Sequence, residues 1–294
     1  MCIRDSFFAL RGLKDAADMA VIVGDDERAA KYATLRDNFR ESLYASIRRT
    51  MAKRNIDYLP GSVELGDLDP TSTSIALVPG GEDGDLPRDA LLRTFDRYWE
   101  EVQARKNGTA WEAYTAYELR NVAALIRLGQ KARALELLDL IVSDQRPPPW
   151  NEWAEVSWRD VSAPRFIGDM PHTWVGAGFI RSLRTMLVYE RESDRALVML
   201  GGTPAAWATS AEGVTIKRLP TYYGTLNATL RADGQNALRL KLTGDLTMPP
   251  GKIVVQSPLD RPLAGASVNG RALEGVTGDS FVVGEFPADV VLRY

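Results

Sequence analysis

The chain has 294 residues, with 36 lysines and arginines against 39 aspartates and glutamates, and a formal net charge of −3. This length allows one large or two medium domains, and the interspersed charges form no basic stripe that would suit nucleic acid. One cysteine, Cys2, and one histidine, His172, exclude disulfides, thiolate zinc sites and multi-histidine centres within the chain, so we expect no metal or other cofactor. No apolar run approaches the roughly eighteen residues of a membrane span, so we expect no membrane insertion.

The first six residues, Met1 to Ser6, resemble a translated sequencing-adapter artefact of metagenomic genes. We therefore interpret residues 1–6 as a non-native leader on a truncated gene. Alternatively, Ser6 is a plain helix N-cap ahead of Phe7 and Phe8. Under both interpretations the segment carries no function.

Residues 7–192 are predicted to be helical, because apolar residues recur there at spacings of three and four. One predicted helix ends at Gly24, and the next begins with acidic residues after it and runs to about Met51. A similar pair returns near residue 120 and turns at Gly129, which indicates a loosely repeated αα-hairpin. Further helices are predicted at Asp69-Pro70-Thr71, at Leu86-Pro87 and over residues 171–190.

From residue 193 to 294 the pattern changes to short alternating runs separated by Gly, Pro, Asn and Asp, which is typical of antiparallel strands. Asn269-Gly270 is a strong signal for a two-residue hairpin. This spacing predicts a small antiparallel β-sandwich domain. The candidate strands are Val214 to Arg218, Gly224 to Arg231, Ala237 to Thr243, Lys252 to Gln256, Phe281 to Val283 and Val290 to Tyr294.

A long connection separates the helix that ends near Val142 from the one near Pro171, and loops of that length are commonly functional. It holds three tryptophans and several charged residues. Tryptophan faces suit the C–H faces of sugar rings, and carboxylates bind hydroxyls or act as acid and base in glycosidic cleavage. The residues concerned are Trp150, Trp153, Trp158, Glu152, Glu155, Arg159 and Asp160.

Two other interpretations of this loop remain open. It could be a lid whose tryptophans pack on the helices while its carboxylates face solvent. Alternatively, Pro147-Pro148-Pro149 could be a polyproline ligand for an SH3-type partner.

A second loop, from Ile56 to Thr71, concentrates carboxylates with a tyrosine and glycines that permit close approach of a ligand. Glu64 and Asp67 are candidates for binding substrate hydroxyls. We assign Asp69 to capping the helix that follows it.

Two further segments carry candidate binding residues. Trp111 and Glu112 lie at a predicted helix start over residues 107–114, although Trp111 could equally be a core residue. His172 and Trp174 lie close to the start of the last predicted helix. His172 is most simply a hydrogen-bonded structural histidine, with direct catalysis as the alternative.

In chain order these loops resemble the second half of the six-hairpin glycosidase toroid, and most closely bacterial α-L-rhamnosidase-like proteins, including a branch associated with discoidin-type modules. The family has a Trp-Glu-Arg-Trp stretch with a catalytic carboxylate, and an Asn-His-Tyr segment that opens the last barrel helix. The matching residues here are Trp150-Asn151-Glu152-Trp153, Pro171-His172-Thr173-Trp174-Val175-Gly176-Ala177, and Asp69-Pro70-Thr71-Ser72-Thr73 in place of a short Gln-Thr helix.

The resemblance implies the C-terminal part of an (α/α)6 helical barrel over residues 7–192, followed by the β-sandwich. It also implies an inverting glycoside hydrolase in which Glu152 is the general base. Asn151 follows Trp150 directly and no arginine separates Glu152 from Trp153, so Glu155 is the alternative base. The family's general acid lies in an earlier part of the polypeptide, so we expect this chain alone to be inactive.

The expected partners are a carbohydrate substrate and the missing N-terminal part of the same polypeptide. The family implies an extracellular or periplasmic location. An alternative function is a non-catalytic, surface-associated protein that binds glycans. A helical repeat scaffold for protein partners is the third possibility, but such repeats follow a short regular period and lack a long tryptophan-rich loop.

Overall fold

The computed structural model describes residues 2–145, 150–160, 162, 168–276 and 278–294. The chain divides into two compact units, Met1–Arg181 and Ser182–Tyr294. The predicted boundary at residue 193 falls inside the second unit, after the strand Val188–Arg191.

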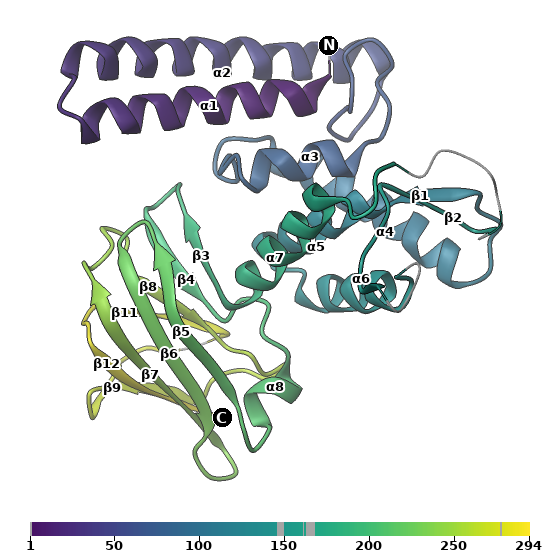
Figure 1. Cartoon of the computed structure of the whole chain (residues 1–294). Helices are drawn as coiled ribbons and strands as arrows, with labels where there is room; N and C mark the ends of the chain where they lie inside the picture. Colours follow the sequence, from purple (N-terminus) through teal and green to yellow (C-terminus); the bar gives the residue numbers. More distant parts are fainter. Residues whose placement is uncertain (1, 146–149, 161, 163–167, 277) are drawn as a thin grey trace. The chain divides into compact units, whose positions relative to one another are not determined.

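The first unit is mostly helical (Figure 1). Asp25 and Asp69 cap the helices that follow them by accepting the backbone N–H groups of Arg28 and Ser72, both at 3.0 Å, which confirms the predicted role of Asp69. None of the described helices is long and apolar enough to cross a membrane. The elements are α1 (Ile3–Ile22), α2 (Asp26–Arg54), α3 (Pro70–Leu77), α4 (Arg88–Lys106), η1 (Ala116–Glu118), α5 (Leu119–Arg127), α6 (Lys131–Ser143) and α7 (Thr173–Leu187), whose last turns belong to the second unit.

The predicted helical-barrel fold is wrong. The described helices form two hairpins, α1–α2 and α5–α6, and α3 packs against α1, α4 and α5, but no clear (α/α)6 barrel results. The turns at Gly24 and Gly129, with φ of +75° and +77°, agree with the predicted hairpins. Helical periodicity identifies each hairpin, whereas closure into a ring depends on packing between hairpins that are distant in sequence. In α2, only Leu43, Tyr44, Ile47 and Thr50 are buried.

Residues 3–6 of the segment interpreted as a leader form the start of α1. Ile3 and Ser6 are buried, and the Ile3 N–H donates to the Gly61 carbonyl at 3.0 Å. Ser6 lies inside the helix, so it is not the N-cap, which is Cys2.

One buried carboxylate joins α1, α2 and the loop between α3 and α4. Glu82 is 0% exposed and accepts hydrogen bonds from Lys14 at 3.1 Å and from Arg40 at 2.9 and 3.0 Å. The hydroxyl of Tyr44 also donates to it. The α1–α2 hairpin is therefore fastened to this loop by ionic hydrogen bonds rather than by apolar packing alone.

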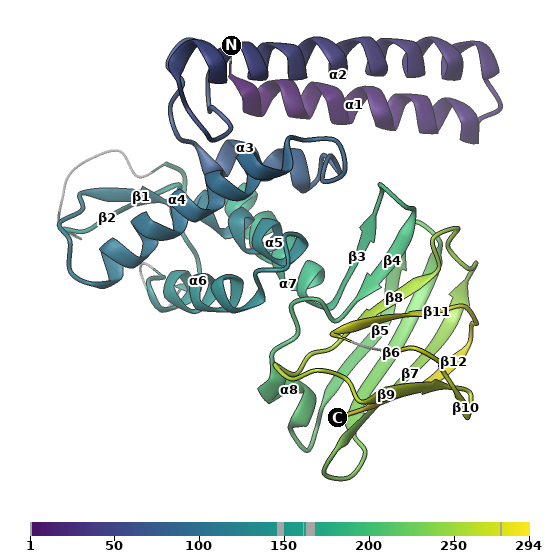
Figure 2. The ribbon, with the colours of Figure 1, turned by 180° about the vertical axis from the view of Figure 1, so that it is seen from behind.

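The second unit is a β-sandwich of two sheets (Figure 2). One sheet is antiparallel with the order β10-β9-β12-β7-β6-β5, and the other has the order β11-β8-β4-β3 with β4 parallel to β8. All six predicted strands are present. The strands are β3 (Val188–Arg191), β4 (Ala196–Met199), β5 (Val214–Thr221), β6 (Gly224–Ala232), β7 (Ala237–Leu246), β8 (Ile253–Gln256), β9 (Gly265–Val268), β10 (Arg271–Ala272), β11 (Ser280–Val283) and β12 (Ala288–Arg293), with the short helix α8 (Ala205–Thr209).

Alternation along the strands builds the core of this sandwich. Alternate residues of β6 and β7 point inward, so β6 places three apolar side chains in the core and β7 places four. Asn269 and Gly270 both have positive φ, at 50° and 78°, in the predicted hairpin between β9 and β10. The inward residues of β6 and β7 are Leu226, Ala228, Leu230, Leu238, Leu240, Leu242 and Leu246.

Candidate functional site

A two-stranded sheet in the first unit brings two distant segments together. β1 (Ala113–Thr115) pairs antiparallel with β2 (Val156–Trp158). The predicted helix start at residues 107–114 is therefore wrong, because pairing with the distant loop replaces the local helical preference. Beyond this sheet, the Glu155 carbonyl accepts the Ala116 N–H at 3.2 Å and the Thr115 hydroxyl at 3.0 Å. Backbone hydrogen bonding of Glu155 therefore holds it next to the segment that contains Tyr117.

Tyr117 and His172 form a hydrogen-bonded pair. The Tyr117 hydroxyl lies 2.6 Å from His172 Nε2, and His172 Nδ1 lies 3.3 Å from Asp169 Oδ2. The Asp169 carboxylate accepts hydrogen bonds, so the contacts fit the tautomer with its proton on Nδ1, in which Nε2 accepts a hydrogen bond from the Tyr117 hydroxyl. Asp169 thereby orients His172, and His172 orients Tyr117.

Burial raises the pKa of Tyr117, and the negative charge of Glu155 raises it further. The Tyr117 phenol is therefore neutral at physiological pH and remains a hydrogen-bond donor. His172 is only 8% exposed, whereas the Asp169 side chain is 81% exposed. The hydrogen-bonded series Asp169–His172–Tyr117 therefore extends from solvent at Asp169 to the half-buried Tyr117.

Aromatic rings flank the Tyr117–His172 pair. Trp174, at the start of α7, is 47% exposed and meets the Tyr117 ring edge-on at a centroid distance of 5.5 Å. The Arg120 guanidinium lies over both rings, at 4.0 Å from Tyr117 and 4.8 Å from Trp174. A half-exposed indole beside hydrogen-bonding groups is a surface on which a sugar ring can stack.

The Glu155 carboxylate belongs to the same group of residues. A Cβ placed on Gly168, where φ is +77°, would lie 2.9 Å from Glu155 Oε2. Glycine at this position therefore lets the chain approach the carboxylate one residue before Asp169. We call the set Tyr117, Arg120, Glu155, Asp169, His172 and Trp174 the Tyr117 cluster.

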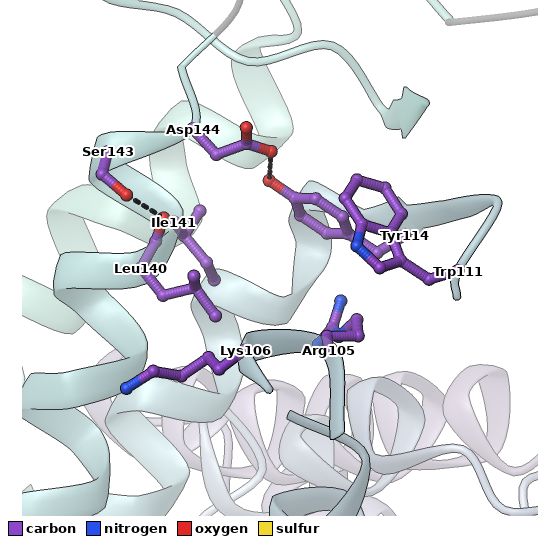
Figure 3. A pocket seen from close by; sticks show the side chains of 8 residues that line it. All are labelled: Arg105, Lys106, Trp111, Tyr114, Leu140, Ile141, Ser143 and Asp144. Carbon is purple, nitrogen blue, oxygen red and sulfur yellow. Dashed lines mark hydrogen bonds between the residues drawn. The ribbon is translucent and has the colours of Figure 1, made fainter. Parts of the chain in front are cut away.

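A pocket of about 290 Å³ lies elsewhere in the same unit (Figure 3). The Trp111 and Tyr114 rings form one wall, with centroids 5.7 Å apart, and Leu140 and Ile141 lie on another. The Tyr114 hydroxyl donates to Asp144 at 2.6 Å, and burial followed by this bond raises the pKa of Tyr114. The lining residues, which we call the Trp111 pocket, are Arg105, Lys106, Trp111, Tyr114, Leu140, Ile141, Ser143 and Asp144.

Both cations of the Trp111 pocket are matched by carboxylates. Arg105 donates to both carboxylate oxygens of Glu118, with one contact of 3.1 Å, and Lys106 pairs with Glu136. The positive charges of these two residues are therefore offset, and the Asp144 carboxylate also lines the pocket. Its size is near the lower end of the range for small-molecule sites.

The predicted residues of the long loop between α6 and α7 lie in different environments. Trp153 is 3% exposed, and its indole donates to the Ile141 carbonyl at 2.9 Å, so this ring belongs to the core and cannot stack on a sugar. Trp150 is 61% exposed, while Glu152 and Trp158 are half-buried, the latter opposite Ala113 in the small sheet. Of the two predicted catalytic carboxylates, only Glu155 joins the Tyr117 cluster. Pro147-Pro148-Pro149 lies outside the described residues.

The candidates of the Ile56–Thr71 loop have local contacts. Asp67 accepts the backbone N–H and the hydroxyl of Ser62 at 3.0 and 2.7 Å, which closes a turn. Glu64 is exposed, and its carbonyl accepts a hydrogen bond from Arg54. Glu112 is exposed beside the Trp111 pocket without lining it.

Sequence reasoning missed Tyr117, Arg120, Asp169 and Tyr114. Tyr117 in η1 and Arg120 in α5 are three residues apart, a spacing that matches an ordinary helix face. The sequence offers one signal for Arg120, the lack of an acidic residue three or four positions away, and its burial at 8% exposure is seen only in the structure.

No group of three or more His, Cys, Asp or Glu side chains suited to a metal ion occurs in the described ranges. The sequence matches no known protein-family model, and no curated protein matches it.

Proposed function

We propose that the Tyr117 cluster is the glycan-binding and glycan-cleaving site of a glycoside hydrolase. The observation that carries this proposal is the hydrogen-bonded series Tyr117–His172–Asp169 beside the Glu155 carboxylate and the half-exposed Trp174 ring. A sugar ring needs an aromatic face and oriented polar groups, and its cleavage needs a carboxylate. The cluster offers all of these.

In this proposal Glu155 is the general base that activates water for inverting cleavage. Tyr117, whose proton is donated to His172, accepts a hydrogen bond from a sugar hydroxyl, and Trp174 stacks on the ring. From the family resemblance we expect the acid that protonates the leaving oxygen to come from a preceding part of a longer polypeptide. Glu152 is not assigned a role, because its described surroundings do not connect it to the cluster.

A second candidate function is glycan binding without cleavage at the Trp111 pocket. Aromatic rings form one wall of this pocket, and Asp144 is held there by Tyr114. Such a pocket can bind a neutral sugar, but it lacks a described pair of carboxylates on opposite sides of a scissile bond.

Glycan-array binding with three tryptophan variants separates the two candidates. We expect Trp174→Ala to weaken glycan binding at least tenfold, about 1.4 kcal/mol, because the stacking surface is lost. Trp207→Ala, in the second unit, is the matched control, since Trp207 is 43% exposed and Trp174 is 47% exposed.

Trp111→Ala distinguishes the outcomes. Under the first proposal this variant retains binding to the main glycan ligand. Loss of binding in Trp111→Ala together with full binding in Trp174→Ala would replace the first proposal with the second.

A further inference from the structure

Arg120 is a buried cation without a carboxylate partner among the described residues. It is 8% exposed, and its Nη2 makes no hydrogen bond within the described part of the chain. Its guanidinium lies over the rings of Tyr117 and Trp174. A buried charge normally has an ionic partner, because removing it from water alone is costly.

The surroundings of Arg120 add positive charge. Burial lowers the pKa of Arg120 to about 10, and the nearby Arg4 and Arg181 lower it as well. Tyr117 and Asp69 act in the opposite direction without offsetting these effects. At physiological pH Arg120 is still charged, and its surroundings hold two further guanidinium groups, Arg181 and Arg4, of which Arg4 is paired with Asp5 at 3.0 Å.

Helix α7 presents a suitable face to this region. Trp174, Gly178 and Arg181 are spaced i, i+4 and i+7, so they lie on one side of the helix. A Cβ on Gly178 would lie 3.6 Å from Arg120 Cγ, which places this glycine against the stem of Arg120. Trp174 is half-exposed and Arg181 is exposed, so a ligand can approach this face from solvent.

We propose that Arg120 binds an anionic group, a carboxylate or a sulfate ester, carried by the glycan that occupies the Tyr117 cluster. This inference rests on the proposed function and specifies its substrate class as an acidic glycan. A planar guanidinium matches the oxygens of such groups and forms strong charge-assisted hydrogen bonds with them.

The distribution of charge in the cluster gives the sugar an orientation. Glu155 and Asp169 are the carboxylates near Tyr117 and His172, and Arg120 is the cation that lies over both the Tyr117 and the Trp174 ring. An acidic sugar stacked on Trp174 would turn its anionic group toward Arg120 and away from Glu155. Complementary charge of this kind sets specificity and orientation.

Titration calorimetry with three matched oligosaccharides tests the inference: a neutral one, its uronate counterpart and its sulfated counterpart. We expect the wild-type protein to bind an acidic ligand at least tenfold more tightly than the neutral one. This preference should shrink as NaCl rises from 50 to 500 mM, because salt screens the attraction between the charges. Arg120→Gln should remove the preference, so that the ratio of the affinities for the acidic and the neutral ligand falls to about one whatever the variant does to binding of the neutral ligand. Whichever acidic ligand binds more tightly identifies the anionic group.

Arg181→Gln should reduce the preference for the acidic ligand in part. Because Arg181 is exposed, this variant tests the inference even if Arg120→Gln does not fold. Equal binding of neutral and acidic ligands by the wild-type protein would overturn this inference and leave the proposed function intact. Binding of none of the three, nor of any glycan on the array, would overturn both.

Discussion

Replacing Glu82 with alanine is expected to lower the free energy of unfolding of the first unit by about 3–5 kcal/mol, the range for breaking a buried ion pair. Glu82 is 0% exposed and receives hydrogen bonds from Lys14, Arg40 and Tyr44. Its removal leaves Lys14 and Arg40 without their shared carboxylate and separates α1 and α2 from the loop. Urea denaturation followed by circular dichroism measures the change.

Glu41→Ala is the matched control, because Glu41 is an exposed carboxylate on α2 next to Arg40. We expect this change to alter stability by less than about 0.5 kcal/mol. Equal effects of the Glu82 and Glu41 variants would show that the buried network does not hold the α1–α2 hairpin.

The same network predicts a pH dependence. Burial alone would raise the pKa of Glu82, but hydrogen bonds from Arg40 and Tyr44 and the charge of Lys14 lower it below its ordinary value of 4.5. A lowered pKa in the folded state stabilises the protein above the unfolded value, and this contribution is lost as pH falls through the folded value. The stability difference between wild type and Glu82→Gln should therefore shrink below pH 4.5. A constant difference would contradict the assigned ionisation.

Replacing Glu155 with glutamine is expected to reduce glycan hydrolysis by about 10²- to 10⁴-fold, the usual contribution of a general base. The amide keeps the size of the side chain but cannot accept the proton of water. Release of reducing sugar from the array-identified glycan measures the effect, in the longest natural polypeptide that contains this chain.

Glu152→Gln is the control for this experiment, since it changes the other predicted carboxylate three residues away in the same loop. We expect Glu152→Gln to retain most of the activity. Full activity in Glu155→Gln would exclude Glu155 as the base, and loss of activity only in Glu152→Gln would assign that role to Glu152.

Local features of the fold were predictable, whereas the arrangement of the helices was not. The glycine turns at Gly24 and Gly129, the Asp69 cap and the Asn269-Gly270 hairpin each depend on a few neighbouring residues, and all occur. The barrel prediction was wrong because it assumed that the two hairpins belong to a closed ring of helices. Local sequence patterns identify hairpins but do not specify how hairpins pack into a ring. The strand at Ala113–Thr115 was missed for a related reason, since its partner lies more than forty residues away in sequence.

The candidate site was predictable only in part. Glu155, His172 and Trp174 were selected from residue type and position, and the structure brings them together through Tyr117. Tyr117 and Arg120 were missed because a tyrosine and an arginine on a helix are ordinary surface residues until burial is known. Trp153 shows the converse, because tryptophan suits both a sugar surface and a core, and only its burial distinguishes the two roles.

The most direct test of the Tyr117 cluster as a glycan site is ¹⁹F NMR of protein labelled with fluorotryptophan, with resonances assigned by single Trp→Phe variants. During titration with the array-identified glycan, we expect the Trp174 resonance to move with saturation while the Trp207 resonance stays in place. A glycan that binds but leaves the Trp174 resonance unmoved would contradict the placement of the site at the Tyr117 cluster.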